Sequence, residues 1–163
     1  MRKTLPLILL LLLITLCTCK KDKSSYWILN GVKYSTSVCT FDKLTDTPFA
    51  GHLGISASSG SGPAARIIVC YSNTSGLPAD GTYNVVTDDG VTTPGHGEIM
   101  IRVITGTPGS EVVYHSVGGS GTDGLQSTPD TKNNNRLTLR GAGITIAGGG
   151  DTTYLSLNLT QTN

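Results

Sequence analysis

The chain has 163 residues and a formal net charge of +1, a near-neutral balance that gives no sign of a polyanionic partner. Beyond the first 23 residues, the lysines and arginines are scattered singly rather than gathered in a stripe, so nucleic-acid binding is not expected. The length fits a single domain, and the abundance of glycine, serine and threonine favours a soluble β-rich one.

The first 18 residues have the form of a secretory signal. Arg2 and Lys3 form a short positive segment, and an apolar run over residues 5–16 follows them. This run is too short to span about 30 Å of hydrocarbon as a helix that rises 1.5 Å per residue. Removal of residues 1–18 would take both cations away and leave the mature chain near −1.

The residues that end this segment resemble a bacterial lipobox. A leucine lies three residues before Cys19, and the small Thr18 lies directly before it. Cys17 is the alternative acceptor, although the bulky Leu16 before it fits the motif less well, and an ordinary cleaved signal is the other alternative. The lysine-rich segment after Cys19 is similar to the start of mature Bacteroidetes lipoproteins.

This resemblance implies that Cys19 carries acyl chains such as palmitate, and that residues 19–25 form a lipidated tether to the membrane. It also implies a place in the bacterial cell envelope, as an outer-membrane lipoprotein on either the periplasmic or the surface side.

From residue 26 onward the pattern is that of short strands joined by turns. Asn30-Gly31 is typical of a type I′ turn and predicts a hairpin with strands over 26–29 and 32–41. Trp27 and Leu29 should share one face of the first strand, because side chains alternate along a strand. Residues 42–51, which contain proline, glycine and aspartate, predict a loop.

The middle of the chain holds several further strand patterns. One of them is apolar on both faces, which predicts a central strand at 65–71. The others lie at 52–57, 82–86, 98–105 and 111–116, and at 52–57 and 98–105 apolar residues recur along one face.

The last third of the chain begins with a long segment that has no pattern. Residues 118–135 are therefore expected to form a loop that is mobile or functional. Two strand patterns follow, 136–140 and 144–146, which Gly141-Ala142-Gly143 either separates or bulges. The terminal strand, 154–160, alternates without a fault, so its leucines should face the core.

About nine or ten short strands without helical periodicity predict an antiparallel β-sandwich over residues 26–163, immunoglobulin-like or jelly-roll-like, with a barrel as the alternative. The domain resembles small β domains of uncharacterised Bacteroidetes lipoproteins. The shared features are Trp-x-Leu-Asn-Gly-x-x-Tyr at 27–34, Pro-x-x-Gly-x-Tyr at 78–83 and the alternating terminal strand. These are strand and turn residues, so the resemblance implies no particular activity.

Two cysteines, Cys39 and Cys70, lie within the domain. A disulfide between them would close a loop of about 30 residues and stabilise the fold by roughly 3–4 kcal/mol in the chain-entropy model. The alternative is two separate buried thiols.

No combination of residues forms a catalytic or cofactor-binding signature, so an enzyme is not expected. His52, His96 and His115 lack the paired spacing of zinc or copper ligands, and no metal is assigned. One alternative is an envelope hydrolase that uses Glu98, Glu111 or His115, which requires two of these side chains within about 5–10 Å of each other. Another is a lipocalin-like carrier, which requires an enclosed cavity.

The aromatic residues are the remaining candidates for contacts with a ligand or a partner protein. Four tyrosines that lie beside apolar positions could stack on sugars or pack against a partner, although half-buried tyrosines are also common on sheet faces. They are Tyr26, Tyr34, Tyr114 and Tyr154. Thr152, within Asp151-Thr152-Thr153, is similar to the O-glycosylation acceptor of Bacteroidetes envelope proteins. The function predicted from the sequence is a lipid-anchored binding or structural module for a glycan or another envelope protein.

Overall fold

The computed structural model describes residues 24–60, 64–73, 75–118, 124–130 and 136–162. All regular structure within these ranges is β, which confirms the predicted all-β class. The strands are β1 Ser25–Leu29, β2 Val32–Thr36, β3 Cys39–Lys43, β4 Leu53–Ser58, β5 Ala65–Tyr71, β6 Gly81–Val85, β7 Glu98–Thr105, β8 Val112–Ser116, β9 Gly124–Asp130, β10 Arg136–Gly148 and β11 Asp151–Thr160.

One continuous network of hydrogen bonds joins the strands in the order β2-β1-β11-β10-β9-β6-β7-β5-β4-β3. The remaining strand, β8, pairs with both β7 and β10, so that β10, β9, β6, β7 and β8 form a closed ring. These pairings are antiparallel except for a short parallel one between β6 and β7. This closed ring agrees with the barrel, which the sequence left as the alternative to a sandwich.

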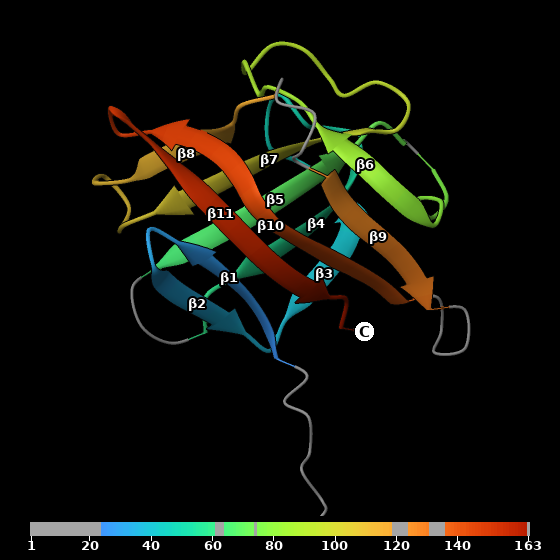
Figure 1. Cartoon of the computed structure of the whole chain (residues 1–163), viewed down its shortest axis with the longest axis horizontal. Helices are drawn as coiled ribbons and strands as arrows, with labels where there is room; N and C mark the ends of the chain where they lie inside the picture. Colours follow the sequence, from blue (N-terminus) through green and yellow to red (C-terminus); the bar gives the residue numbers. More distant parts are fainter. Residues whose placement is uncertain (1–23, 61–63, 74, 119–123, 131–135, 163) are drawn as a thin grey trace, which may run out of the picture.

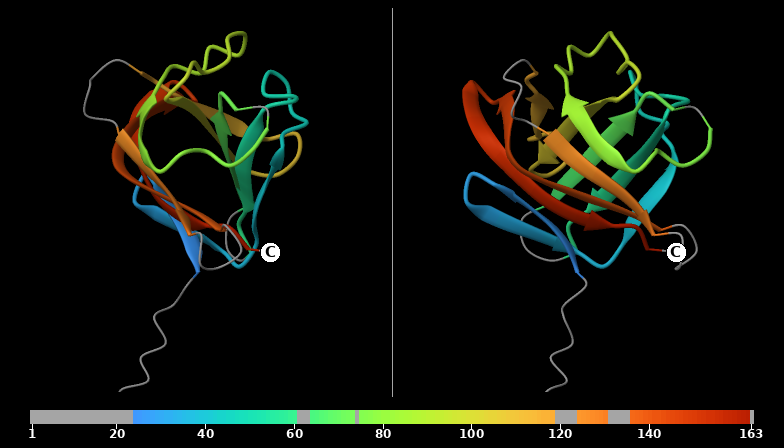
Figure 2. Two further views of the ribbon diagram at one scale, coloured as in Figure 1. Left: turned by 90° about the vertical axis from the view of Figure 1, so that its right-hand side faces the viewer. Right: turned by 45° about the vertical axis from the view of Figure 1, so that its right-hand side comes forward.

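Figures 1 and 2 show two facing walls of strands. We call the wall formed by β2, β1, β11, β10 and β9 wall A, and the wall formed by β7, β5, β4 and β3 wall B. At one end the walls are joined through Cys39 of β3, whose backbone N–H donates to Thr162 Oγ1 at 2.9 Å and whose carbonyl accepts from the Thr162 N–H at 2.8 Å.

The predicted hairpin at the start of the domain is confirmed. Asn30 and Gly31 have φ values of 51° and 74°, as a type I′ turn requires, and Trp27 is fully buried. The extension of the second strand to Phe41 is wrong, because β2 ends at Thr36. The Thr36 hydroxyl there accepts from the Val38 N–H and donates to the Val38 carbonyl, and this turn starts the new strand β3.

The central strand is also confirmed, because β5 lies between β4 and β7 and is buried on both faces. Its inward face joins the main core, which fills the space between the walls with side chains that are 0–8% exposed. Its outward face joins a smaller cluster beneath the 44–52 loop. This second cluster contains Leu44, Phe49, Ile68, Cys70 and Met100.

The prediction of one long loop over residues 118–135 is wrong for the part that the structure describes. β9 lies within this segment and pairs with β6 and β10, and Leu125 and Ser127 are fully buried. The rest of the segment, 119–123 and 131–135, lies outside the described residues. In β10, the register shifts between Gly141 and Ile144, so the glycine-rich stretch bulges one continuous strand.

Candidate functional site

The outer face of wall A is formed by the side chains that alternate with the core residues along its strands. The leucines of β11 point into the core, so the residues between them point outward, and the same alternation holds on β1 and β10. Cross-strand pairing aligns these outward side chains in rows. One row crosses five strands and consists of Ser35, Tyr26, Asn158, Arg140 and Gln126.

This row combines hydrogen-bonding groups with an aromatic ring. The Arg140 Nε–H donates to Asn158 Oδ1 at 3.3 Å, and Lys33 Nζ lies 4.5 Å from the centroid of the Tyr26 ring. Tyr154 lies on the same face, four residues before Asn158 on β11, or about 13 Å at 3.3 Å per residue. Its side chain is prominent because 70% of the residue surface is exposed.

The structure therefore divides the four tyrosines that the sequence singled out. Tyr26 and Tyr154 lie on the outer face of wall A, where a ligand can reach them. Tyr34 belongs to the core and stacks on Trp27 with ring centroids 5.6 Å apart, so it is not a ligand-stacking residue. Tyr114, on β8, packs against the core from its edge.

The second polar arrangement is centred on Asp88, whose side chain is fully buried on the outer side of wall B. Its carboxylate accepts from Arg102 Nε at 2.9 Å, from Arg102 Nη2 at 2.8 Å and from the Gly90 N–H at 3.1 Å. His115 Nδ1 lies 2.8 Å from Asp88 Oδ2. We call Asp88, Arg102 and His115 the Asp88 cluster.

No local pattern in the sequence predicts the Asp88 cluster, because its three members lie on separate segments. Asp88-Asp89-Gly90 taken alone is typical of a turn. The turn itself is present, since Asp89 accepts from the N–H groups of Val91 and Thr92. These hydrogen bonds lower the pKa of the Asp89 carboxyl below its usual value.

The geometry required for a hydrolase is absent for the two glutamates. Glu98 lies at the start of β7, where its carboxylate accepts from the Gly95 N–H at 2.7 Å. Glu111 lies beyond the opposite end of the same strand, next to Ile104 and Gly106. His115 pairs with Arg102 in the middle of β7 and contacts Asp88 instead. The two-carboxylate arrangement of glycoside hydrolases is therefore not formed by these residues.

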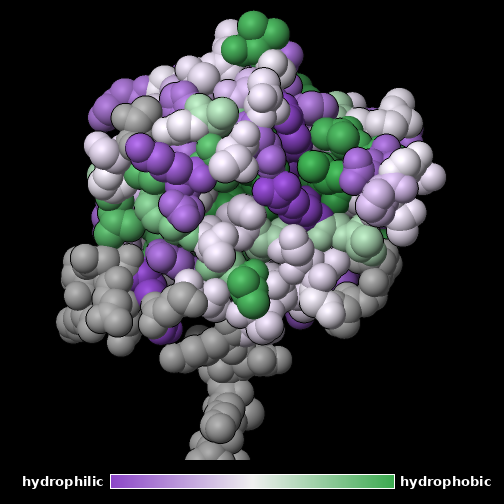
Figure 3. All heavy atoms as spheres, turned by 180° about the vertical axis from the view of Figure 1, so that it is seen from behind, coloured by the Kyte–Doolittle hydropathy of each residue, from purple (hydrophilic) through white to green (hydrophobic). Residues whose placement is uncertain are grey.

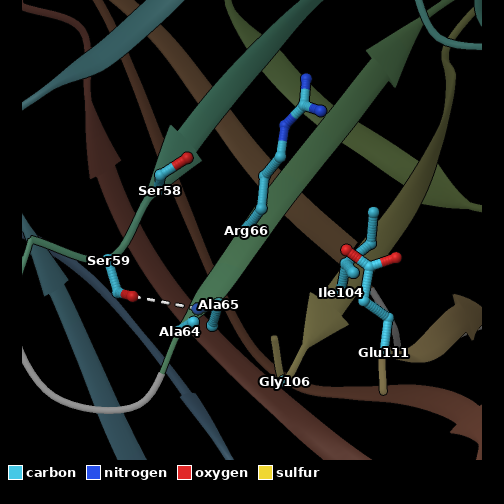
Figure 4. A pocket seen from close by; sticks show the side chains of 8 residues that line it. All are labelled: Ser58, Ser59, Ala64, Ala65, Arg66, Ile104, Gly106 and Glu111. Atoms are coloured by element: carbon cyan, nitrogen blue, oxygen red, sulfur yellow. Dashed lines mark hydrogen bonds between the residues drawn. The ribbon is translucent and has the colours of Figure 1, made fainter. Parts of the chain in front are cut away.

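A shallow pocket of about 270 Å³ lies between β4, β5 and the turn after β7, with Ser58, Arg66 and Glu111 in its lining (Figure 4). The guanidinium of Arg66 points away from Glu111 and forms an ion pair with Asp46 at 2.8 Å. On the face seen in Figure 3, hydrophilic and hydrophobic side chains are interspersed.

Cys39 and Cys70 are both free, so the alternative of two separate buried thiols is the one that the structure has. Cys39 belongs to the main core and Cys70 to the cluster beneath the 44–52 loop. The pKa of each thiol is raised to about 12, mainly by burial. For Cys70 the nearby Asp88 carboxylate acts in the same direction as burial, and Arg102 acts against it. Neither thiol is suited to act as a nucleophile, because the thiolate is the reactive form.

The remaining predicted sites are placed as follows. Thr152 is exposed at the start of β11, which is where a modifying enzyme could reach it. Among the described residues, no group of three or more potential ligands could hold a metal ion, and neither His52 nor His96 contributes to one. The proposed lipidation site, Cys19, lies outside the described residues.

Comparisons with protein families, curated proteins and solved structures found no match to this chain. In the described part of the chain, no helix has the length and apolar character needed to cross a membrane.

Proposed function

We propose that this protein is a lipid-anchored module of the bacterial cell envelope that binds a glycan on the outer face of wall A. The observation that carries this proposal is the aligned row of outward side chains from β2 to β9, with Tyr26 within it and Tyr154 beside it. Aromatic rings offer an apolar face for sugar rings, and amide, hydroxyl and guanidinium groups bond sugar hydroxyls.

The extent of this surface supports a polymer rather than a small molecule. Neighbouring strands lie about 4.8 Å apart, so five aligned positions extend over roughly 19 Å. The row consists of residues on strands rather than on loops, and a rigid surface loses little conformational entropy when it binds. We also propose that the fold is best classified as a β-sandwich. Its two walls are joined by β8, which pairs with β10 and β7, and by β6, which pairs with β9 and β7.

The test is binding of purified protein to immobilised polysaccharides of different composition, followed by variants of the two tyrosines. Tyr154→Ala should weaken binding at least about fivefold, since an aromatic contact contributes about 1 kcal/mol. Val91→Ala is the control, because Val91 is 81% exposed and lies on the loop between β6 and β7, outside the strands of wall A. Circular dichroism and thermal unfolding check that each variant is folded.

A protein partner in the envelope is the other candidate that the sequence suggested. If no polysaccharide binds, and a partner cross-linked on intact cells contacts residues outside wall A, the glycan proposal is wrong.

Lipid anchoring is tested separately. Mass spectrometry of the native mature protein should find acyl chains on Cys19, and Cys19→Ala should move the protein from the membrane to the soluble fraction. Cys17→Ala should leave it in the membrane. The reverse pattern would identify Cys17 as the acceptor, and an unmodified N-terminus would overturn the anchor.

A further inference from the structure

The carboxylates of the described residues are unevenly distributed between the two sides of the domain, whereas lysines and arginines lie on both. The cations on the outward positions of wall A are Lys33, Arg136 and Arg140, and no carboxylate lies among the outward side chains that the structure describes there. Asp80, Asp130 and Asp151 lie at strand ends near this wall, and Asp130 is paired with Arg136 where β9 and β10 meet. Six carboxylates lie on β3, on β7 or on the loops of wall B, namely Asp42, Asp46, Asp88, Asp89, Glu98 and Glu111.

One of the wall A cations, Arg140, lies in the row that we propose as the glycan-binding surface, and Lys33 lies beside this row. Lys33 lies on β2 and holds its ammonium group over the Tyr26 ring, and Arg140 lies on β10 beside Asn158. Three strand spacings separate β2 from β10, which corresponds to about 14 Å between their backbones. A polymer lying across the row can therefore meet one cation on each side of the Tyr26–Asn158 pair.

The guanidinium of Arg140 and the ammonium of Lys33 favour glycans that carry carboxylates over neutral ones. A guanidinium group forms a planar pair of hydrogen bonds that matches a carboxylate, whereas a neutral sugar offers only hydroxyl groups. Because no described carboxylate on this face competes for Arg140 or Lys33, an anionic ligand meets attraction without a nearby repelling charge.

We propose that the ligand of wall A is an acidic polysaccharide, whose sugar residues carry carboxylates that pair with Arg140 and Lys33. This inference rests on the proposed function, which it narrows to one class of glycan. The sugar rings lie against Tyr26 and Tyr154, and the amides of Asn158 and Gln126 bond their hydroxyl groups.

The experiment measures binding of the full-length protein to polygalacturonate, to neutral dextran and to vesicles of phosphatidylglycerol. Wild type should bind polygalacturonate, and this binding should weaken as salt rises, because salt screens exposed charges. Arg140→Gln should weaken it about tenfold, the loss expected for one charge-assisted hydrogen-bonding group. Lys33→Gln should weaken it in the same direction.

Arg66→Gln is the matched control, because it removes a partly exposed arginine from wall B. It should leave binding unchanged, and thermal unfolding of each variant shows whether the fold is intact.

Each contrary outcome has its own meaning. Binding to dextran that depends on Tyr154 but is indifferent to Arg140→Gln would overturn the acidic ligand and leave the proposed function standing. Binding to no polysaccharide would overturn both. Binding to vesicles but not to polygalacturonate, with loss in Arg140→Gln, would replace the glycan by an anionic lipid surface. An equal loss in Arg66→Gln would show that wall A is not the binding surface.

Discussion

His115 Nδ1 lies 2.8 Å from Oδ2 of Asp88, and this contact joins β8 to the loop that follows β6. The same carboxylate holds Arg102 of β7 through two hydrogen bonds. Arg102 in turn donates from Nη1 to the Thr47 carbonyl at 3.2 Å and lies 4.7 Å from the centroid of the Phe49 ring. The Asp88 cluster therefore holds the loop between β6 and β7 and the 44–52 loop against wall B. Within the cluster, the buried Asp88 carboxylate is paired with Arg102.

Removal of this carboxylate should destabilise the domain strongly. Asp88→Asn leaves the Arg102 side chain, which is only 12% exposed, without its charge partner. Breaking a buried ion pair in this way costs about 3–5 kcal/mol, because the remaining charge is left uncompensated. Urea unfolding at neutral pH measures the change.

Asp89→Asn is the control for this prediction, since Asp89 is exposed and asparagine can keep the turn that it forms. We expect it to change stability by less than about 0.5 kcal/mol. Equal effects of the two substitutions would show that the Asp88 cluster contributes nothing beyond its turn.

The elements that the sequence predicted well are those with local signals. The hairpin depends on Asn30-Gly31, and the bounds of β7 match the strand predicted at 98–105, where Ile99, Ile101 and Val103 share one face. The Asp88 cluster lacked such a signal, because Arg102 and His115 are 14 and 27 residues from Asp88 along the chain. Only the pairing of β7 with β8 and the path of the intervening loop bring them together.

Contacts between distant segments also decide whether Cys39 and Cys70 can pair and which tyrosines are exposed, so the sequence alone could not predict either property. The separation of these residues depends on which face of each strand points inward, and a shift of one residue in register exchanges the faces. Cys39 points into the core, whereas Cys70 points toward the 44–52 loop. Tyr34 and Tyr26 lie on neighbouring strands in the same way, one inward and one outward.

Stability should fall in alkaline solution because of the buried thiols. Burial raises the pKa of Cys39 and Cys70 from 9.0 to about 12 in the folded protein. Above pH 9 the unfolded chain loses these protons while the folded protein keeps them, so stability is full below pH 9 and falls as pH rises toward 12. The slope is at most about 1.4 kcal/mol per pH unit for each thiol. Burial also raises the pKa of Tyr71, which acts in the same direction at higher pH.

Unfolding free energies measured at intervals from pH 8 to pH 11 test this dependence. Cys39→Ala should make the decline shallower between pH 9 and 11, whatever its effect on stability at pH 8. An unchanged slope in this variant would mean that the Cys39 thiol does not titrate as the structure implies.

Gly54→Ala should destabilise the packing of the 44–52 loop on wall B. A Cβ atom at this position would lie 2.5 Å from the Val69 carbonyl oxygen and 2.6 Å from Leu44 Cδ1. Overpacking of this kind costs about 1–3 kcal/mol. Gly60→Ala is the control, because the nearest atom to its Cβ would be 3.9 Å away. Denaturant midpoints compare the two variants, and a Gly54→Ala midpoint equal to that of wild type would contradict the close approach.

The burial of Leu125 decides whether β9 belongs to the folded core or to a long loop, as the sequence alone suggested. Leu125 is fully buried and is paired with Tyr83 on the neighbouring strand β6. Leu125→Ala should therefore lower the free energy of unfolding by about 2–5 kcal/mol. Gln126, the next residue, is exposed on the outer face of wall A, so Gln126→Ala should change stability by less than about 0.5 kcal/mol. Chemical denaturation of both variants gives the comparison. If Leu125→Ala were as stable as wild type, the segment would not close the ring between β10 and β6, and wall A would end at β10.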